Sequence, residues 1–165
     1  MSSCSRARRH LLGAIAALGL AGCGFHLRGD VGYPFTTIFL ATPPTAPIAA
    51  ELKRSLVGVT VVDNAGAAQT ILDIAPVVDD KQVLSLSGGG RVREFMLTKR
   101  VSFRLHDAEG RDWLPATELT IRRAYAYSES EVLAREQQEA RLLKEMQTDA
   151  VQQIVRRLQS ARKPV

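Results

Sequence analysis

Hydrophobic and polar residues follow two different periods along this chain, and each period indicates a type of secondary structure. Residues 91–105 and 117–127 place apolar side chains at every second position, beginning with Phe95 and Leu97 in the first segment. A period of two is that of a β-strand with one buried face. Turn-forming residues at 107–110 separate the two segments. The pattern therefore predicts an antiparallel hairpin with one solvated face.

Two other segments carry apolar residues at intervals of three and four. Ile48, Leu52 and Leu56 lie four positions apart shortly after Pro47, which is the spacing of one helix face with proline near the first turn. Residues 130–159 repeat the helical period among strong helix formers and predict one long amphipathic helix. An apolar side on each helix is expected to cover a sheet.

Further segments are rich in β-branched and aliphatic residues. Residues 36–40 predict a strand, and 59–62 a possible short strand. Residues 70–78 and 81–87 form either one bent strand or two. These elements predict an α+β fold, a two-layer sandwich in which two helices pack on a roughly four-stranded, mostly antiparallel sheet.

The N-terminal 22 residues have the composition of a secretion signal. Three arginines precede an apolar stretch at 11–20 that is too short to span a bilayer. The sequence Leu-Ala-Gly then leads into Cys23, and small residues before a cysteine resemble the bacterial lipobox, in which the thiol is joined to diacylglycerol. The alternative is an ordinary secreted protein with a chance cysteine there. Cys4, the other cysteine, would be removed with the signal, so no disulfide is expected.

The chain is accordingly predicted to divide into a removed signal peptide at 1–22, a lipidated tether at 23–35 and a single α+β domain at 36–162. Cys23 is expected to carry an S-diacylglycerol and an N-acyl chain, and no other cofactor is expected. Gly24 stands where an aspartate would retain a lipoprotein at the inner membrane of enteric bacteria. We therefore expect the lipoprotein sorting machinery to deliver the protein to the outer membrane, lipid-anchored and facing the periplasm.

Charge and motifs argue against two classes of function. Without residues 1–22 the chain keeps 19 basic and 17 acidic residues, a net charge of +2, which does not indicate a nucleic-acid partner. No nucleophile elbow or zinc-protease motif is present, and the glycines at 88–90 lack the lysine that a phosphate loop requires. These glycines predict a hinge or hairpin loop, and the protein is predicted not to be an enzyme.

One strand has an unusual local charge. Five basic residues between positions 91 and 104 accompany a single acid, Glu94; the five are Arg91, Arg93, Lys99, Arg100 and Arg104. A solvated face of an antiparallel sheet explains such a pattern. The functional alternative is an anion site, because guanidinium groups bind phosphates through paired hydrogen bonds and the nearby Phe95 and tyrosines offer apolar contact to acyl chains.

Several short motifs resemble the LptE family of lipopolysaccharide-assembly lipoproteins. The resemblance begins with the octapeptide Gly-Cys-Gly-Phe-His-Leu-Arg-Gly at 22–29 and continues with Arg-Glu-Phe-x-Leu at 93–97 and Trp-Leu-Pro at 113–115. The last helix contributes Lys-Glu-Met at 144–146, Asp-Ala at 149–150 and Ile-x-x-Arg-Leu at 154–158. The motifs occur in the family's order, and the family fold, two helices on a four-stranded sheet, agrees with the pattern above.

The resemblance implies a partner protein without catalytic activity. Family members plug the lumen of the LptD β-barrel, assist its assembly, and bind lipopolysaccharide during delivery to the outer leaflet. Their basic residues near the loop before the long strand and near the start of the last helix correspond most closely to Arg91 and Arg135, with Arg93 as a substitute for Arg91. The basic strand adds Lys99 and Arg100 as candidates. The alternatives are a structural envelope lipoprotein that binds another barrel or the cell wall, and a lipid-anchored hydrolase.

Overall fold

The computed structural model describes residues 32–43, 45–127 and 132–164, except for the side chains of 132–135. Gly32–Val165 forms one compact unit. The expected signal peptide, the lipid-bearing Cys23 and most of the expected tether lie outside the described residues. Within the described part of the chain, no helix is both long and apolar enough to cross a membrane.

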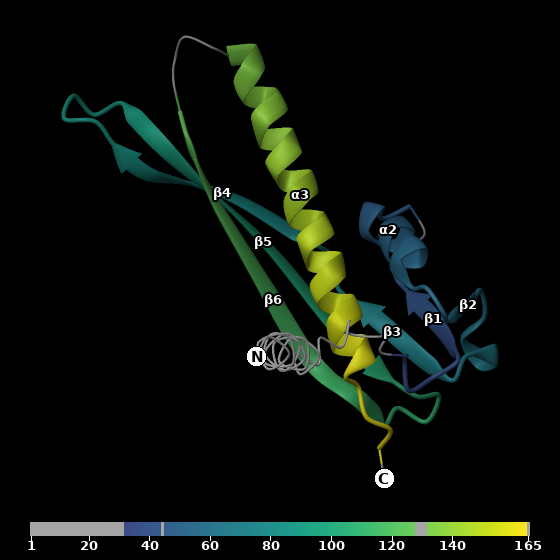
Figure 1. The fold of residues 1–165 in the computed structure, drawn as a ribbon. Coiled ribbons are helices and arrows are strands. Elements are labelled where there is room, and N and C mark those ends of the chain that lie inside the picture. The colour runs from purple at the N-terminus through teal and green to yellow at the C-terminus, as the bar shows by residue number, and fades with distance from the viewer. Residues whose placement is uncertain (1–31, 44, 128–131, 165) are drawn as a thin grey trace, which may run out of the picture. The chain divides into compact units, whose positions relative to one another are not determined.

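Two α-helices, one short 3-10 helix and six strands make up the described fold (Figure 1). In chain order they are β1 Thr37–Ala41, α2 Pro47–Ser55, β2 Thr60–Val62, η1 Ala65–Ala67, β3 Thr70–Ile74, β4 Val78–Leu86, β5 Val92–His106, β6 Asp112–Ala126 and α3 Val132–Gln159.

The strands form one mixed sheet. Its order is β2, β1, β3, β5, β4, and β6 pairs with β5 along the edge that β3 and β4 leave open. β1 is parallel to both β2 and β3, and the other pairs are antiparallel. The predicted α+β class with two helices is confirmed. The prediction of a roughly four-stranded, mostly antiparallel sheet is wrong, because β1, α2 and β2 form a parallel crossover unit that enlarges the sheet.

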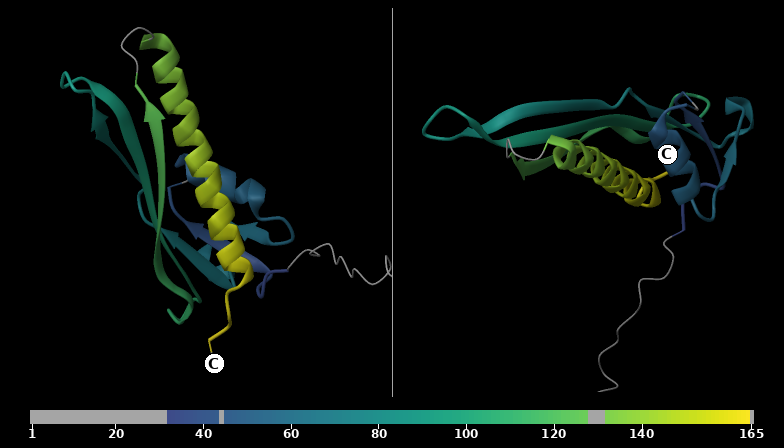
Figure 2. Two further views of the ribbon diagram at one scale, coloured as in Figure 1. Left: turned by 60° about the vertical axis from the view of Figure 1, so that its left-hand side comes forward. Right: turned by 90° about the horizontal axis from the view of Figure 1, so that it is seen from above.

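α3 covers one face of the sheet along β5 and β6 (Figures 1 and 2). Its buried side chains recur at intervals of four, as the sequence period predicts. Met146, Ala150, Ile154 and Leu158 are each 0% exposed. They pack in a single core with the inward side chains of the strands, so the C-terminal half of α3 is fixed by apolar contacts.

α2 lies on the same face of the sheet and is joined to α3 by polar contacts. Glu51 accepts hydrogen bonds from Gln147 Nε2 at 2.8 Å and from Thr148 Oγ1 at 2.6 Å. α2 begins at Pro47, as predicted, and Gly58 follows its end with a φ of 86°. Only glycine adopts such a φ without cost, which explains why the helix ends before this position.

β3 and β4 follow the same edge of β5 one after the other. Ile74 lies opposite Phe103, whereas Val78 lies opposite Arg100. The chain therefore advances four positions along this edge while β5 advances three, which inserts one extra residue between the two strands. This irregularity has the effect of a β-bulge and settles the open question about residues 70–87 in favour of two strands.

The extra residue exchanges the two faces of the strand, because side chains alternate with a period of two. In β3 the even-numbered Leu72 and Ile74 point into the core. In β4 the odd-numbered positions share the helix-covered face, since Asp79 lies opposite Lys99 and Lys81 opposite Leu97. Two charged side chains of β4, Asp79 and Lys81, thus lie on the helix-covered face of the sheet.

Candidate functional site

The five candidate cations lie in different places. Arg91 and Arg93 are at the far end of the β4–β5 hairpin, which extends beyond α3 in the right-hand view of Figure 2. Arg100 is exposed on the helix-free face of β5, and Lys99 is buried on the opposite face. Arg135 lies in α3, but its side chain is outside the described residues. The basic strand is therefore not one continuous cationic surface.

A tight turn closes the hairpin and places Arg91. The Ser87 N–H donates to the Arg91 carbonyl at 2.7 Å, and the Arg91 N–H donates to Ser87 Oγ at 3.1 Å. Gly90 has a φ of 76°, a left-handed conformation that glycine adopts readily. The glycines at 88–90 thus form a hairpin loop, which is one of the two structures that the sequence predicts for them.

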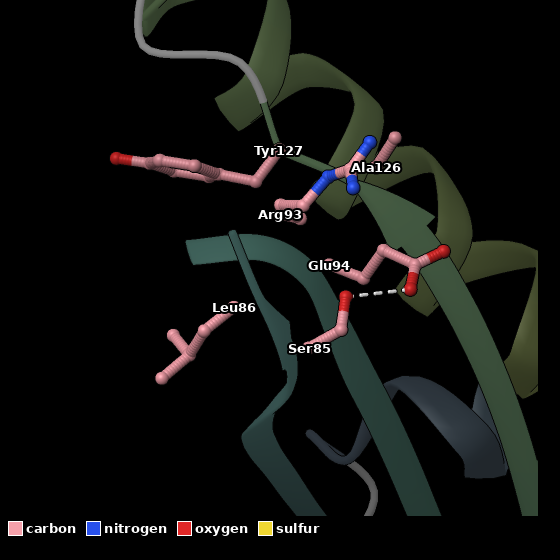
Figure 3. Close-up of a pocket in the computed structure, with 6 residues that line it drawn as sticks. All are labelled: Ser85, Leu86, Arg93, Glu94, Ala126 and Tyr127. Atoms are coloured by element: carbon pink, nitrogen blue, oxygen red, sulfur yellow. Dashed lines mark hydrogen bonds between the residues drawn. The ribbon is translucent and has the colours of Figure 1, made fainter. Parts of the chain in front are cut away.

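Arg93 lines a shallow pocket of about 550 Å³. The pocket is formed by Ser85, Leu86, Arg93, Glu94, Ala126 and Tyr127. Ser85 Oγ donates to Glu94 Oε2 at 2.7 Å. Figure 3 shows this hydrogen bond as a dashed line, with Arg93 beside Ala126. Among the described residues, no carboxylate lies within ion-pair distance of the exposed Arg93 guanidinium. Arg93 is therefore available to an anion from outside the chain.

Aliphatic side chains are exposed on the same hairpin as these cations. Three residues near the end of β4 are about half exposed: Val83 is 51%, Leu84 48% and Leu86 58% exposed. We call residues 83–93 the hairpin tip. Exposed large apolar side chains that gather beside cations are typical of a surface that contacts an amphiphile or another protein. The sequence analysis did not single out these three residues as exposed, because apolar residues in a strand are expected to face the core.

An aromatic cluster continues from the hairpin tip along the helix-covered face. The Phe95 ring lies 5.8 Å from the Tyr125 ring and 5.1 Å from the Tyr127 ring. The Lys81 ammonium lies 4.5 Å from the centre of the Phe95 ring. A cation over an aromatic face is stabilised by the ring quadrupole. Phe95 and the tyrosines were predicted to offer apolar contact, whereas Lys81 was not singled out.

Glu139 of α3 ties this cluster to the helix. Its carboxylate accepts hydrogen bonds from the Lys81 ammonium and, at 2.7 Å, from the Tyr125 hydroxyl. The bond to Lys81 lowers the pKa of Glu139, and the bond to Tyr125 adds to this effect. The bond to Glu139 raises the pKa of Lys81, while burial raises the pKa of Tyr125. All three directions are those expected of a carboxylate held between an ammonium and a phenol.

Lys99 is separated from the candidate surface by its burial. It is 3% exposed, and its ammonium donates to Asp79 Oδ1 at 2.6 Å across the β4–β5 pair. This ion pair offsets the cost of burying the charge. The described contacts therefore assign Lys99 a role in the packing of the sheet.

We expect Asp79→Asn to reduce the free energy of unfolding by about 1–3 kcal/mol, because it leaves the Lys99 ammonium buried without a counterion. The figure is below that of a fully buried pair because Asp79 is 44% exposed. Lys99→Met should cost less, within about 1 kcal/mol, since methionine fills the same space and a half-exposed carboxylate remains hydrated. Urea unfolding of both variants measures the difference; equal losses would contradict the asymmetry.

Comparison with known proteins places this geometry in context. The sequence model of one family, described as LptE, lipopolysaccharide-assembly, matches residues 35–158. The chain is 27% identical over 153 residues to the LPS-assembly lipoprotein LptE of Photorhabdus laumondii, covering 90% of this chain and 83% of that protein. It is 29% identical over 154 residues to that of Yersinia pestis, covering 90% of this chain and 73% of the relative.

Solved structures show the same fold. Lipoprotein B from Nitrosomonas europaea superposes with a TM-score of 0.73 at 35% identity, over 83% of this chain and 91% of that one. Rare lipoprotein B from Shewanella oneidensis has a TM-score of 0.67 at 23% identity, over 76% of this chain and 95% of that one. The family match extends from the residues before β1 to the last turn of α3.

Proposed function

Because this chain belongs to the LptE family of lipopolysaccharide-assembly lipoproteins, we propose that it plugs an LptD-type β-barrel and helps to assemble it. In this proposal the protein also binds lipopolysaccharide for delivery to the outer leaflet. Lipid on Cys23 holds it at the outer membrane, facing the periplasm. No catalytic step is part of this function.

The hairpin tip is the observation that carries the lipopolysaccharide part of the proposal. It places the cations of Arg91 and Arg93 on the same hairpin as the exposed side chains of Val83, Leu84 and Leu86. Lipopolysaccharide combines phosphates with acyl chains, and guanidinium groups bind phosphates through charge-assisted hydrogen bonds. The tip therefore offers complementary chemistry to both parts of the ligand.

The structure narrows the candidate residues within this proposal. Arg91 and Arg93 remain in it, and Arg135 remains on the basis of the family resemblance. Lys99 is left out because it is buried and paired with Asp79. Arg100 lies on the helix-free face, away from the hairpin tip, so the proposed single binding site does not include it.

The helix-free face supports the barrel part of the proposal. On β5 and β6 this face carries small and polar side chains such as Ser102, Thr120 and Ala124, together with charged ones such as Arg100 and Glu118. A polar face and a net charge of only +2 without the expected signal peptide suit a domain surrounded by a polar barrel interior. The identity of the barrel rests on the family.

Charge reversal at the hairpin tip tests the ligand. We expect the Arg91→Asp/Arg93→Asp variant to bind lipopolysaccharide about tenfold more weakly, which corresponds to ~1.4 kcal/mol, because two phosphate contacts become repulsive. Arg141→Asp is the matched control, since Arg141 is an 81%-exposed arginine on α3 outside the tip. Equilibrium binding of labelled lipopolysaccharide measures both, and circular dichroism verifies folding. Equal affinities for the two variants would remove the tip from the proposed site.

Affinity purification of the tagged, lipidated protein from outer membranes tests the partner. A large β-barrel of the LptD kind recovered at near one-to-one stoichiometry supports the plug function. Recovery of only a different barrel or of cell-wall components would overturn it in favour of a structural envelope lipoprotein.

A further inference from the structure

α3 is attached to the sheet in two different ways along its length. Its C-terminal half is fixed by side chains that are entirely buried, from Met146 to Leu158. In the preceding residues 136–145 the contacts are weaker. Leu142 and Leu143 are only partly buried, and residues 136–138 are exposed. The free energy needed to separate this part of the helix from the sheet is therefore much lower.

The polar contacts described between residues 136–145 and the sheet converge on one carboxylate. Glu139 accepts from Lys81 on β4 and from Tyr125 on β6. By contrast, the other described ion pair between α3 and the sheet, Arg123 with Asp149, lies in the half that the apolar core already holds. Glu139 is thus the main attachment of a segment that has little apolar anchoring.

The Glu139 carboxylate lies where an anion from outside the chain would bind, beside an ammonium group and two aromatic rings. The Lys81 ammonium lies over the Phe95 ring and within 5.8 Å of the Tyr125 ring centre. Lys81 is 40% exposed at its side chain, so an external anion can approach it. An ammonium beside aromatic rings is suited to a phosphate carried on a sugar or acyl framework, because the rings supply apolar contact.

Lys81 and Arg93 are spaced along the same hairpin. Lys81 lies opposite Leu97, four residues from Arg93 on β5. At about 3.3 Å per residue the two positions are roughly 13 Å apart along the strand. The cations are therefore placed to contact two separate anionic groups of one ligand.

We propose that Lys81, Phe95 and Tyr125 form a second anion subsite for the lipopolysaccharide ligand, and that Glu139 is its internal competitor. This inference rests on the lipopolysaccharide-binding function proposed above. A ligand phosphate displaces the Glu139 carboxylate from Lys81. The segment 136–143 of α3 then separates from the sheet, and the Phe95 and Tyr125 rings become accessible to the apolar part of the ligand. The C-terminal half of α3 stays in place.

Three variants of the mature lipidated protein test the competitor. Glu139→Gln keeps the size of the side chain and removes its charge, so lipopolysaccharide should bind about two- to fivefold more tightly, the range set by an exposed ion pair. Lys81→Met should bind more weakly by a similar factor. Asp149→Asn, the matched control, removes the ion pair of the apolar half and should leave the affinity unchanged. Phosphatase-treated lipopolysaccharide should not distinguish Glu139→Gln from the wild type.

Amide hydrogen exchange supplies a readout that does not depend on affinity. Residues 136–143 should exchange several-fold faster in Glu139→Gln, and also in the wild type once lipopolysaccharide is bound, while residues 146–158 stay protected. Unchanged or weaker binding by Glu139→Gln, or ligand protection of 136–143, overturns the inference and leaves the proposed function intact. Absence of lipopolysaccharide binding by the wild type overturns both.

Discussion

Replacing Cys23 by alanine is expected to abolish lipidation and to leave the protein as an uncleaved precursor. The thiolate is the nucleophile that accepts diacylglycerol, and alanine has no atom that can replace it. Each methylene of an anchored acyl chain contributes about 0.8 kcal/mol to membrane binding, so the variant loses the acyl-chain contribution that holds the mature protein at the membrane. No other variant of this chain should change its behaviour as much.

Cys4→Ala is the matched control, because Cys4 is the other cysteine and lies within the expected signal peptide. Intact-mass spectrometry, together with incorporation of an alkyne-labelled fatty acid, distinguishes precursor from lipidated product. The control should be processed like the wild type. Normal cleavage and sorting of the Cys23 variant would show that the lipobox interpretation is wrong.

Ile154→Ala should produce the largest loss of stability among alanine substitutions in α3. Ile154 is 0% exposed and lies in the centre of the buried side of the helix. Truncation of a fully buried isoleucine to alanine leaves a cavity and typically costs about 2–5 kcal/mol. Alanine has the higher helix propensity, so the loss measures packing rather than helix formation.

Gln152→Ala serves as the control, because Gln152 is exposed on the same turn of the helix. Thermal and urea unfolding should show a midpoint lowered by roughly 10 °C for Ile154→Ala and nearly unchanged for Gln152→Ala. A loss below about 1 kcal/mol for Ile154→Ala would mean that the core can close around the missing atoms.

Local periodicity predicted the elements in which apolar side chains recur at regular intervals. The alternation in residues 91–105 and 117–127 corresponds to β5 and β6, and the helical period corresponds to α2 and α3. The parallel pairing of β1 with β2 and β3 could not be predicted in this way. β2 has only three residues. It pairs with β1 because the connection through α2 brings it alongside, and no pattern within the strand itself indicates this pairing.

The candidate site was predictable only where its residues are close in sequence. Arg91 and Arg93 stand out as a basic pair beside a glycine loop. Lys81 and Glu139 meet although 58 positions separate them, and Lys81 faces α3 because of the extra residue between β3 and β4. Lys99 shares the parity of Leu97, yet its burial depends on Asp79, which the same irregularity brings to that face.

The order of strand pairing has a consequence for how the chain folds. β4, β5 and β6 are neighbours in both sequence and space, and each is joined to the next by a short turn. β1, however, can complete its pairing only after α2, β2 and β3 have been positioned. Because nearby contacts cost less loop-closure entropy, we expect the three-stranded meander to form first and to template α3. The parallel edge would then assemble last, so slow steps in refolding should report on β1 rather than on the hairpin that carries the proposed binding site.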